Sequence, residues 1–388
     1  MIGFTLSDEQ LAIQKLARDF AEREIKPVVP EFERDQSGER AEGVLRKAAK
    51  VGLLGLPVPV QFGGGGGGNL ECCLVEEEIA AACGGIATAM GASWFAQTPV
   101  MMAATPEQRQ RWFPLFAATE EANICCMAMT EPQGGTDIEN PHLEARTIRT
   151  IVRADGDLLT VNGHKLWPSN SDNACLYTVV ATVDPGLGEA GSCLVLVPRG
   201  TPGLSVGRPY KKMGMDADRN GDIYFDNVQV HPSHLLGKVG DGARLLQRTL
   251  IYNRTGAAAI AVGIARGAFE SALQYAKERM VAGAPMMQHP LISAMLGDMA
   301  TSIDAARLLV LRSAWFNSNR QANMRWASMA KVFATDMAMK VTTDCVQIMG
   351  SYGYSKEGGV EKYMRDAKIT QISIGANEFT RQVIGESL

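Results

Sequence analysis

The chain changes its hydrophobic repeat twice, and this double change limits the folds that it can adopt. Residues 5–125 carry apolar side chains at helical spacing, residues 126–236 alternate β-branched and polar residues between turn signals, and the remainder returns to long helical patterns. A segment with one repeat cannot settle in an element with the other repeat, because it would bury the wrong face. The pattern therefore predicts a helical unit, a β unit and a second helical unit in series.

The predicted fold class is α+β with several domains. A chain of 388 residues exceeds the size of about 250–300 residues at which a single core stops growing. We predict an N-terminal helical domain, a middle β-barrel or sandwich domain and a C-terminal helical bundle, with bounds at 1–125, 126–236 and 237–388. The apolar faces of the last domain predict a helical bundle that self-associates, with helices near 241–282, 290–318 and 321–349.

Local signals refine this outline. Ser7 and Gln10 form a predicted capping box, and Pro27 and Pro30 are expected to end the helix that follows. A second helix is predicted over 44–56, and Pro106 is expected to open another. In "RTIRTIVRADGDLLTVNGHKLW" the Asp-Gly and Asn-Gly steps predict hairpin turns. The glycine run 63–68 matches G-x-G-x-x-G only trivially, and its helical neighbours favour a flexible surface loop.

Composition excludes several classes of protein. The net charge of −4 provides no basic field for nucleic acid. No apolar run reaches about 18 residues, so no membrane span is predicted, and "MIGFTLSDEQ" lacks the pattern of a signal peptide. The eight cysteines contain no C-x-x-C and include two vicinal pairs, which favours reduced thiols in the cytoplasm. His231 and His234 have no neighbouring acid or thiol cluster, so no metal site is predicted.

The segment "MAMTEPQGGTD", residues 127–137, is the first candidate for a binding site. A short apolar run enters a turn that presents main-chain N–H groups together with the hydroxyls of Thr130 and Thr136. Such a turn suits an anion or the polar edge of a heterocycle. Taken alone, the segment is equally compatible with an ordinary turn at the start of a strand.

Several stretches in the same order resemble the acyl-CoA dehydrogenase family. "MAMTEPQGGTD" resembles its T-E-P-x-A-G-S-D signature, and "VNGHKLWPSN" resembles N-G-x-K-x-W-I-T-N. "DCVQIMGSYGY" resembles D-x-x-Q-I-x-G-G-x-G-Y, and "VEKYMRDAKITQI" resembles the run before the active-site turn. The resemblance covers nearly the whole chain. It implies a four-helix bundle as the C-terminal domain, FAD as cofactor, an acyl-CoA thioester as substrate, a homotetramer, and an acceptor such as electron-transfer flavoprotein.

The resemblance also assigns expected positions to the flavin site. The main part is expected from Met127, Met129, Thr130, Gly135, Thr136, Trp167, Ser169, Ala376 and Glu378. A second part is expected across the subunit interface, from Arg279, Gln347, Ile348, Gly350 and Ser351. Arg279 is expected to pair with the pyrophosphate, and Trp167 to stack beside the flavin ring. The chain departs from the family pattern at Pro168, at Val281-Ala282 and at Pro290.

The usual catalytic acid of the family is missing. The turn Y-E-G-T aligns with Ser373-Ile374-Gly375-Ala376, so the base position holds Ile374. Some members keep the acid one residue before an arginine, but there this chain has Asn253 before Arg254. Arg254 and Asn253 are therefore candidate catalytic residues, with Glu378 as a displaced base. Substrate contacts are expected from Thr136, Arg254 and Gly375.

The expected function is FAD-dependent oxidation of a short, branched or cyclic acyl-CoA. The bulky Trp94 and Phe95 could shorten the acyl pocket, although core packing is the commoner role of such residues. One alternative is a reaction without proton removal, either a desulfinase-like elimination or the reduction of an enoyl-CoA. Another is a non-catalytic partner subunit in a mixed tetramer.

Overall fold

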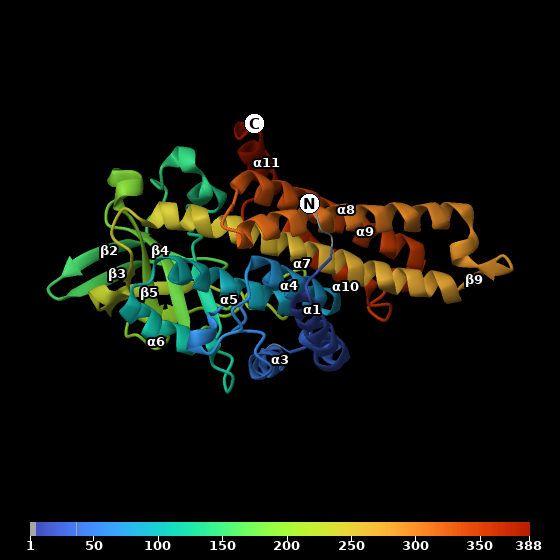
Figure 1. Ribbon diagram of the computed structural model, residues 1–388, viewed down its shortest axis with the longest axis horizontal. Coiled ribbons are helices and arrows are strands. Elements are labelled where there is room, and N and C mark those ends of the chain that lie inside the picture. Colours follow the sequence, from blue (N-terminus) through green and yellow to red (C-terminus); the bar gives the residue numbers. More distant parts are fainter. Residues whose placement is uncertain (1–4, 36) are drawn as a thin grey trace.

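The computed structural model describes residues 5–35 and 37–388, and it confirms the predicted order of a helical, a β and a second helical unit (Figure 1). The first unit contains α1 (Asp8–Phe20), α2 (Val29–Phe32), α3 (Glu39–Lys50), α4 (Asn69–Ala82), α5 (Gly84–Ala103) and α6 (Pro106–Ala117). The last contains α7 (Gly242–Glu278), α8 (Pro290–Ser318), α9 (Met324–Tyr354), α10 (Val360–Thr370) and α11 (Asn377–Glu386). A small hairpin of β9 (Met280–Val281) and β10 (Ala284–Pro285) joins α7 to α8.

The middle unit is a sheet in the order β6-β7-β3-β2-β4-β5-β8, with β1 paired in parallel to β4. Its strands are β1 (Cys125–Ala128), β2 (Ile151–Asp155), β3 (Leu158–Lys165), β4 (Leu176–Thr182), β5 (Ser192–Pro198), β6 (Leu204–Val206), β7 (Ile223–Val230) and β8 (Leu235–Leu236). Every residue of β4 is buried, which explains its unbroken apolar run. Among the described strands β1 pairs only with β4, and side chains of Ser93 and Asn170 bond the main chain of Cys125.

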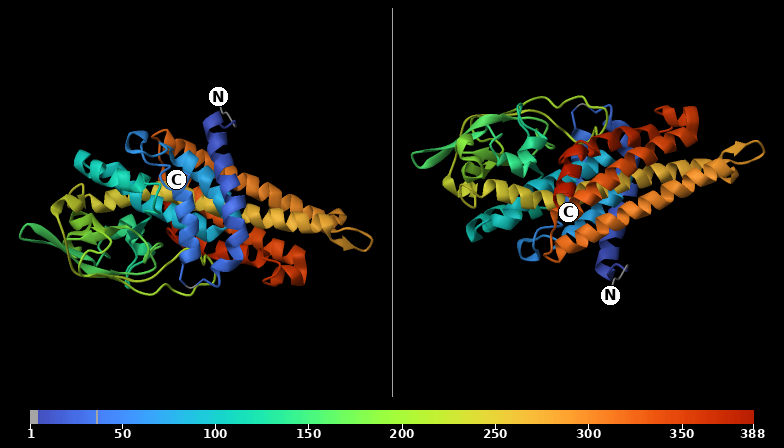
Figure 2. Two further views of the ribbon diagram at one scale, coloured as in Figure 1. Left: turned by 90° about the horizontal axis from the view of Figure 1, so that it is seen from below. Right: turned by 90° about the horizontal axis from the view of Figure 1, so that it is seen from above.

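The helix α7 connects the sheet to the far end of the bundle (Figures 1 and 2). It packs against α4, α8 and α9, and glycines allow the closest approach. A Cβ on Gly263 would lie 2.3 Å from the carbonyl oxygen of Glu77, which no side chain could tolerate. Among the described helices, α7 alone is long and apolar enough to cross a bilayer, and 67% of its apolar window is buried inside the fold. This burial is typical of a core helix.

Three local predictions were wrong. Asn162 and Gly163 lie inside β3 and form a bulge against β7. Glycine is needed at position 163 because a Cβ there would lie 2.5 Å from Thr150 Oγ1. Pro27 and Pro30 do not end the helical path, since both occupy early positions of short turns where no N–H donor is needed. The helix expected over 44–56 is α3, which ends before Gly52 at a φ of +81°.

The glycine run 63–68 forms a loop at the surface, as expected, and main-chain hydrogen bonds hold this loop in place. Its main chain lies along residues 55–58, with Gly66 N donating to Val58 O at 2.8 Å and Gly67 N donating to Leu56 O at 2.8 Å. A Cβ on Gly64 would lie 2.1 Å from Val58 O. The glycines therefore allow two main-chain segments to pack together. The predicted capping box of Ser7 and Gln10 and the helix opened by Pro106 are confirmed.

Candidate active site

The turn between α10 and α11 has a strained main chain. Ile374 has a φ of +53° and Gly375 a φ of +82°, so two successive residues adopt the left-handed conformation. A β-branched residue rarely does so, and such a conformation costs on the order of 1–3 kcal/mol. The surrounding structure must therefore hold this turn, and strain of this kind is common where a turn presents groups to a ligand.

A buried lysine holds the turn from α9. Lys331 Nζ donates to Gly375 O at 2.6 Å and to the side chain of Asn377 at 2.7 Å. Burial lowers the pKa of Lys331 to about 7, and the neighbouring positive charge of Arg254 acts in the same direction. The lysine thus fixes the carbonyl side of the turn and the first residue of α11.

A buried ion pair holds the same turn from α7 and from the loop after β1. Arg254 Nη2 lies 3.1 Å from Glu139 Oε2, and their side chains are only 1% and 3% exposed. Arg254 also donates from Nη1 to Ser328 Oγ at 3.1 Å, and its Nε lies 3.4 Å from Ile374 O. Burial raises the pKa of Glu139, although the charge of Arg254 opposes this. Protein groups beside the turn therefore engage the guanidinium of Arg254.

The predicted flavin segment lies against the other side of the turn. Thr136 Oγ1 accepts a hydrogen bond from Ala376 N at 3.4 Å. Ile374 packs against a buried apolar cluster that includes Met127, Met129 and Phe95. The structure thus brings together residues that are more than 200 positions apart in the chain, as the predicted site requires.

A second buried ion pair braces the end of β1. Lys165 Nζ lies 2.7 Å from Glu131 Oε1 and donates to Met129 O at 2.9 Å. Glu131 in turn accepts from Thr150 N at 2.9 Å. Burial opposes the ionisation of both partners, but the pKa of Glu131 is lowered overall because Lys165 and Thr150 stabilise its charge. The segment that starts at Met127 therefore has a rigid support.

The residues of this region fit a flavin. In the loop after β1, a Cβ on Gly135 would have only Thr130 Cγ2 nearby, at 4.0 Å, so there is room beside the main chain. Trp167 is 52% exposed and stacks on Tyr210 with ring centres 3.9 Å apart, which presents a flat apolar surface. Ser169 donates to Asp218 at 2.9 Å.

The second predicted part of the flavin site lies far from the first part within one chain. Arg279 follows the end of α7, 25 residues after Arg254, which corresponds to about 38 Å of helix. Its neighbours there come from the end of α9, since Tyr275 stacks on Tyr352 with centres 5.8 Å apart. The α9 positions Gln347, Gly350 and Ser351 are exposed, whereas Ile348 is 4% exposed. Gly350 breaks the helix with a φ of +60°.

The other two predicted catalytic residues occupy different surroundings. Asn253 is half-buried on α7, and its amide nitrogen donates to Thr249 O at 3.0 Å. Glu378 is exposed in the first turn of α11, where its charge raises the pKa of Lys331 only weakly. Our sequence analysis did not identify Glu139 or Lys331. Glu139 follows the T-E-P segment without a local signal, whereas a lysine within the apolar run of α9 was a detectable exception to the pattern.

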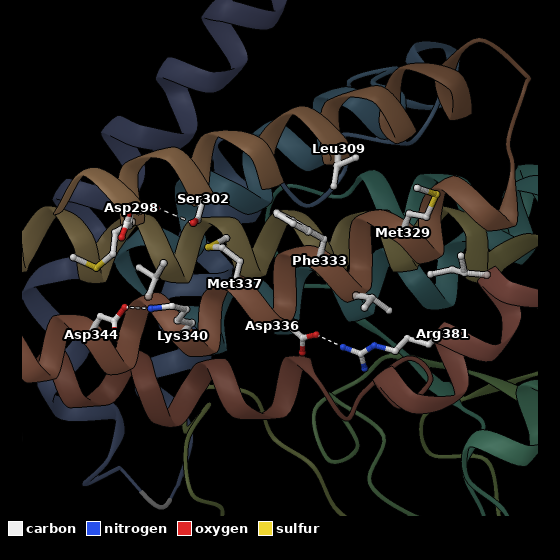
Figure 3. A pocket seen from close by; sticks show the side chains of 14 residues that line it. Asp298, Ser302, Leu309, Met329, Phe333, Asp336, Met337, Lys340, Asp344 and Arg381 are labelled. Carbon is white, nitrogen blue, oxygen red and sulfur yellow. Dashed lines mark hydrogen bonds and ion pairs between the residues drawn. The ribbon is translucent and has the colours of Figure 1, made fainter. Parts of the chain in front are cut away.

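A groove elsewhere on the molecule contains none of these residues. It lies between α8, α9 and α11 and has a volume of about 540 Å³ (Figure 3). Phe333 and Leu309 contribute apolar walls, while the pairs Asp336–Arg381 and Lys340–Asp344 lie along one side. The candidate site is thus distinct from this apolar face of the bundle.

Comparison with known proteins places the whole chain in one group. Models of the acyl-CoA dehydrogenase N-terminal, middle and C-terminal domains match residues 7–120, 126–228 and 240–388. A cyclohex-1-ene-1-carbonyl-CoA dehydrogenase of Geobacter metallireducens is 37% identical over 99% of this chain and 98% of its own length. The solved butyryl-CoA dehydrogenase of Megasphaera elsdenii has a TM-score of 0.92 and 34% identity, covering 100% and 99% of the two chains. A chain in a structure described as the electron transferring flavoprotein of Acidaminococcus fermentans has a TM-score of 0.94 and 35% identity, covering 100% and 99%.

Proposed function

Because this chain belongs to the acyl-CoA dehydrogenase family, we propose that it oxidises a short, branched or cyclic acyl-CoA with a proton acceptor outside the usual turn. Proteins of this family are FAD-dependent oxidoreductases that act on CH–CH groups. When bound, FAD accepts the hydride. The chain's own residues must therefore bind the thioester, polarise its carbonyl group and remove one proton.

One observation carries this proposal. The main-chain N–H of Ile374 points from a strained turn and makes no hydrogen bond to the described residues. A fixed main-chain donor of this kind stabilises negative charge on a thioester oxygen, and such donors contribute several kcal/mol to catalysis, roughly 10²–10³-fold in rate. This donor does not depend on the side chain. The turn can therefore activate an acyl-CoA although Ile374 cannot accept a proton.

Arg254 is proposed as a positioning residue rather than a group that touches the substrate. Its donors already engage Glu139, Ser328 and the carbonyl of Ile374. Together with Lys331 it fixes the direction of the Ile374 N–H. Thr136 and Gly375 remain the proposed substrate contacts, because both line the junction between the turn and the loop after β1.

The flavin site is proposed to form between two copies of the chain. Arg279 and the exposed α9 residues Gln347, Gly350 and Ser351 lie at the far end of the bundle from Trp167 and Thr136. A second copy placed against the first would supply them. The exposed apolar residues Trp315 on α8 and Phe333 on α9, at 50% and 42%, support the burial of apolar surface on these two helices in a homotetramer. Ile348 is proposed to support this part from the core.

The pocket is proposed to accept a short or cyclic acyl group. Trp94 is fixed in the core by a 2.9 Å hydrogen bond from its ring nitrogen to Leu54 O. Phe95 packs in the same apolar cluster as Ile374, so it limits the depth available beside the turn. The similarity to a cyclohex-1-ene-1-carbonyl-CoA dehydrogenase supports a cyclic substrate. The similarity to a chain in an electron transferring flavoprotein structure supports an acceptor of that class. Eight free cysteines support a cytoplasmic location.

The test is an anaerobic visible spectrum of the purified protein before and after adding butyryl-CoA, isobutyryl-CoA and cyclohexanecarbonyl-CoA. We expect a flavin band that one of these thioesters bleaches. A band that shifts but never bleaches would refute oxidation of these thioesters and favour the elimination or reduction that the absence of an acid at 374 allows. A folded protein that holds no flavin would favour a non-catalytic partner subunit.

A further inference from the structure

A buried carboxylate on α4 has no partner. Glu76, Glu77 and Glu78 are consecutive and all nearly buried, at 5%, 6% and 2% exposure. Glu77 pairs with Arg307 at 2.8 Å, and Glu78 with Arg266 at 2.7 Å. Glu76 makes no hydrogen bond or ion pair with any described residue, and its Oε2 is fully buried. Buried carboxylates are normally paired or hydrogen-bonded, so Glu76 needs an explanation.

The carboxylate of Glu76 lies between two glycines on neighbouring helices. A Cβ on Gly91 of α5 would be 2.6 Å from Oε1, and a Cβ on Gly256 of α7 would be 2.8 Å from Oε2. Any larger residue at either position would displace the carboxylate. The two glycines therefore create the space that it occupies, and they provide no polar side chain to satisfy it.

Helices α5 and α7 connect this position to segments of the candidate site. Gly256 is one helical turn after Asn253 on α7, a rise of about 4.5 Å, and it is two residues after Arg254, which contacts the turn at Ile374. Gly91 is one turn before Trp94 and Phe95 on α5, where the floor of the acyl pocket is expected. Glu76 thus lies beside a position of α5 that is one helical turn from the expected floor of the acyl pocket.

The other acids near the site are less suited to accept a proton. Glu139 is paired with Arg254 at 3.1 Å. Glu378 is exposed at the start of α11. Asn253 carries an amide, which does not act as a base. Of the acids compared, Glu76 is the buried one that makes no hydrogen bond or ion pair with the described residues.

We propose that Glu76 is the catalytic residue that accepts the proton in the dehydrogenation proposed above, on which this inference rests. The acidic C–H bond of the acyl group breaks, its proton binds a carboxylate oxygen of Glu76, and its electron pair delocalises toward the thioester carbonyl. A hydride leaves a second carbon for FAD, so the substrate loses two hydrogens and the cofactor gains two electrons. The protonated acid then releases its proton to solvent.

The charge state of Glu76 follows from its surroundings. Burial raises its pKa to about 8. The titratable groups beside it on α4 are the thiols of Cys72 and Cys73, whose pKa values are raised by their own burial first and by Glu76 second. From α5 and α7, Gly91, Gly256 and Ile260 face this region and carry no charge. The ionised fraction should therefore rise tenfold per pH unit below about pH 8.

The first experiment compares Glu76→Gln with wild type in the flavin-loaded protein. We expect Glu76→Gln to keep its FAD and its affinity for cyclohexanecarbonyl-CoA and butyryl-CoA, and to bleach at least about 100-fold more slowly. The wild-type rate should increase with pH up to about 8, and this dependence should disappear in the variant. The matched control is Glu71→Gln on the same helix, which keeps a side-chain oxygen to accept the 2.8 Å hydrogen bond from Gly68 N at the start of α4. A Glu76→Gln rate within threefold of wild type, or a reduced rate with the wild-type pH profile, would overturn the assignment.

A second experiment separates this inference from the proposed function. Hydrogen exchange from the acyl group into D₂O is followed by NMR with the flavin chemically reduced, so that oxidation is blocked. Exchange in wild type that is lost in Glu76→Gln would support the proton acceptor even if no thioester bleaches the flavin. Bleaching that is equal in wild type and Glu76→Gln would leave the proposed function intact and refute Glu76. The absence of both exchange and bleaching in wild type would contradict both ideas.

Discussion

The buried pair of Arg254 and Glu139 should control the stability of the active-site turn. Replacing Arg254 with Met leaves Glu139 only 3% exposed and without its partner at 3.1 Å. Breaking one side of such a pair destabilises a protein by about 3–5 kcal/mol, because one charge remains buried without compensation. We therefore expect Arg254→Met to lower the free energy of unfolding by this amount.

The double variant Arg254→Met/Glu139→Leu provides the stringent test. Replacing both charges with apolar groups removes the uncompensated charge, so we expect the double variant to recover about 1–4 kcal/mol relative to Arg254→Met. The assay is the midpoint of urea denaturation followed by tryptophan fluorescence in the flavin-loaded protein. The control is Asp19→Asn, which breaks the exposed pair Lys15–Asp19 and should leave the denaturation midpoint nearly unchanged, because exposed ion pairs contribute little to stability.

This reasoning would be refuted if the stability losses of Arg254→Met and of Glu139→Leu, each measured alone, added up to the loss in the double variant. Such additivity would mean that Arg254 and Glu139 do not act through each other. The bleaching rate should respond differently from the stability, because the turn loses its contact with Arg254 in every variant that lacks this residue. We expect the double variant to regain stability while it still bleaches more slowly than wild type, since the contact from Arg254 Nε to Ile374 O at 3.4 Å is absent.

Three further predictions concern the turn and α4. Ile374→Glu should raise the bleaching rate with butyryl-CoA, measured in a stopped-flow spectrometer, because it places an acid at the usual base position; a folded, flavin-loaded variant without this gain would contradict a standard pocket. Gly375→Ala should destabilise by about 1–3 kcal/mol in urea, since its Cβ would lie 2.8 Å from Glu139 Oε2 at a φ of +82°, whereas Gly385→Ala meets nothing and should be neutral or stabilising. Glu76→Met should melt at a higher temperature than wild type by calorimetry, and the difference should widen between about pH 5 and pH 8. In this range folded Glu76, with its pKa of about 8, retains a proton that the unfolded chain releases near its ordinary pKa of 4.5, so the stability of the wild type falls as pH rises. A melting-temperature difference that stays constant with pH would argue against this pKa.

Much of the fold was predictable because its signals are local. The capping box of Ser7 and the helix start at Pro106 depend on neighbouring residues alone, and both are confirmed. The change from helical to alternating patterning near residue 125 coincides with the start of β1. The error at Asn162-Gly163 has a non-local cause. This step forms a bulge rather than a turn because Thr150 and β7 lie beside it.

The candidate site was predictable only in part. The motif resemblance predicted that the loop after β1 and the turn at 373–376 belong to one site, and the contact of Thr136 with Ala376 places them together. It did not predict Lys331 or Glu139, because the role of a charged residue depends on its partners, and these come from distant segments. Arg279 and Gln347 remain predictions, because one chain holds them about 38 Å of helix away from Arg254.

The sequence by itself determined the order of helical and β units, and its resemblance to the family predicted that Ile374 stands at the position of the usual acid. It could not distinguish the three consecutive glutamates of α4, which are chemically identical residues in one helix. Only the tertiary structure places Glu77 and Glu78 beside arginines and leaves Glu76 between two glycines. The energy of a buried charge depends on its desolvation and on the groups that approach it in space. For this reason packing, rather than sequence, decides which of these acids is free to take part in chemistry.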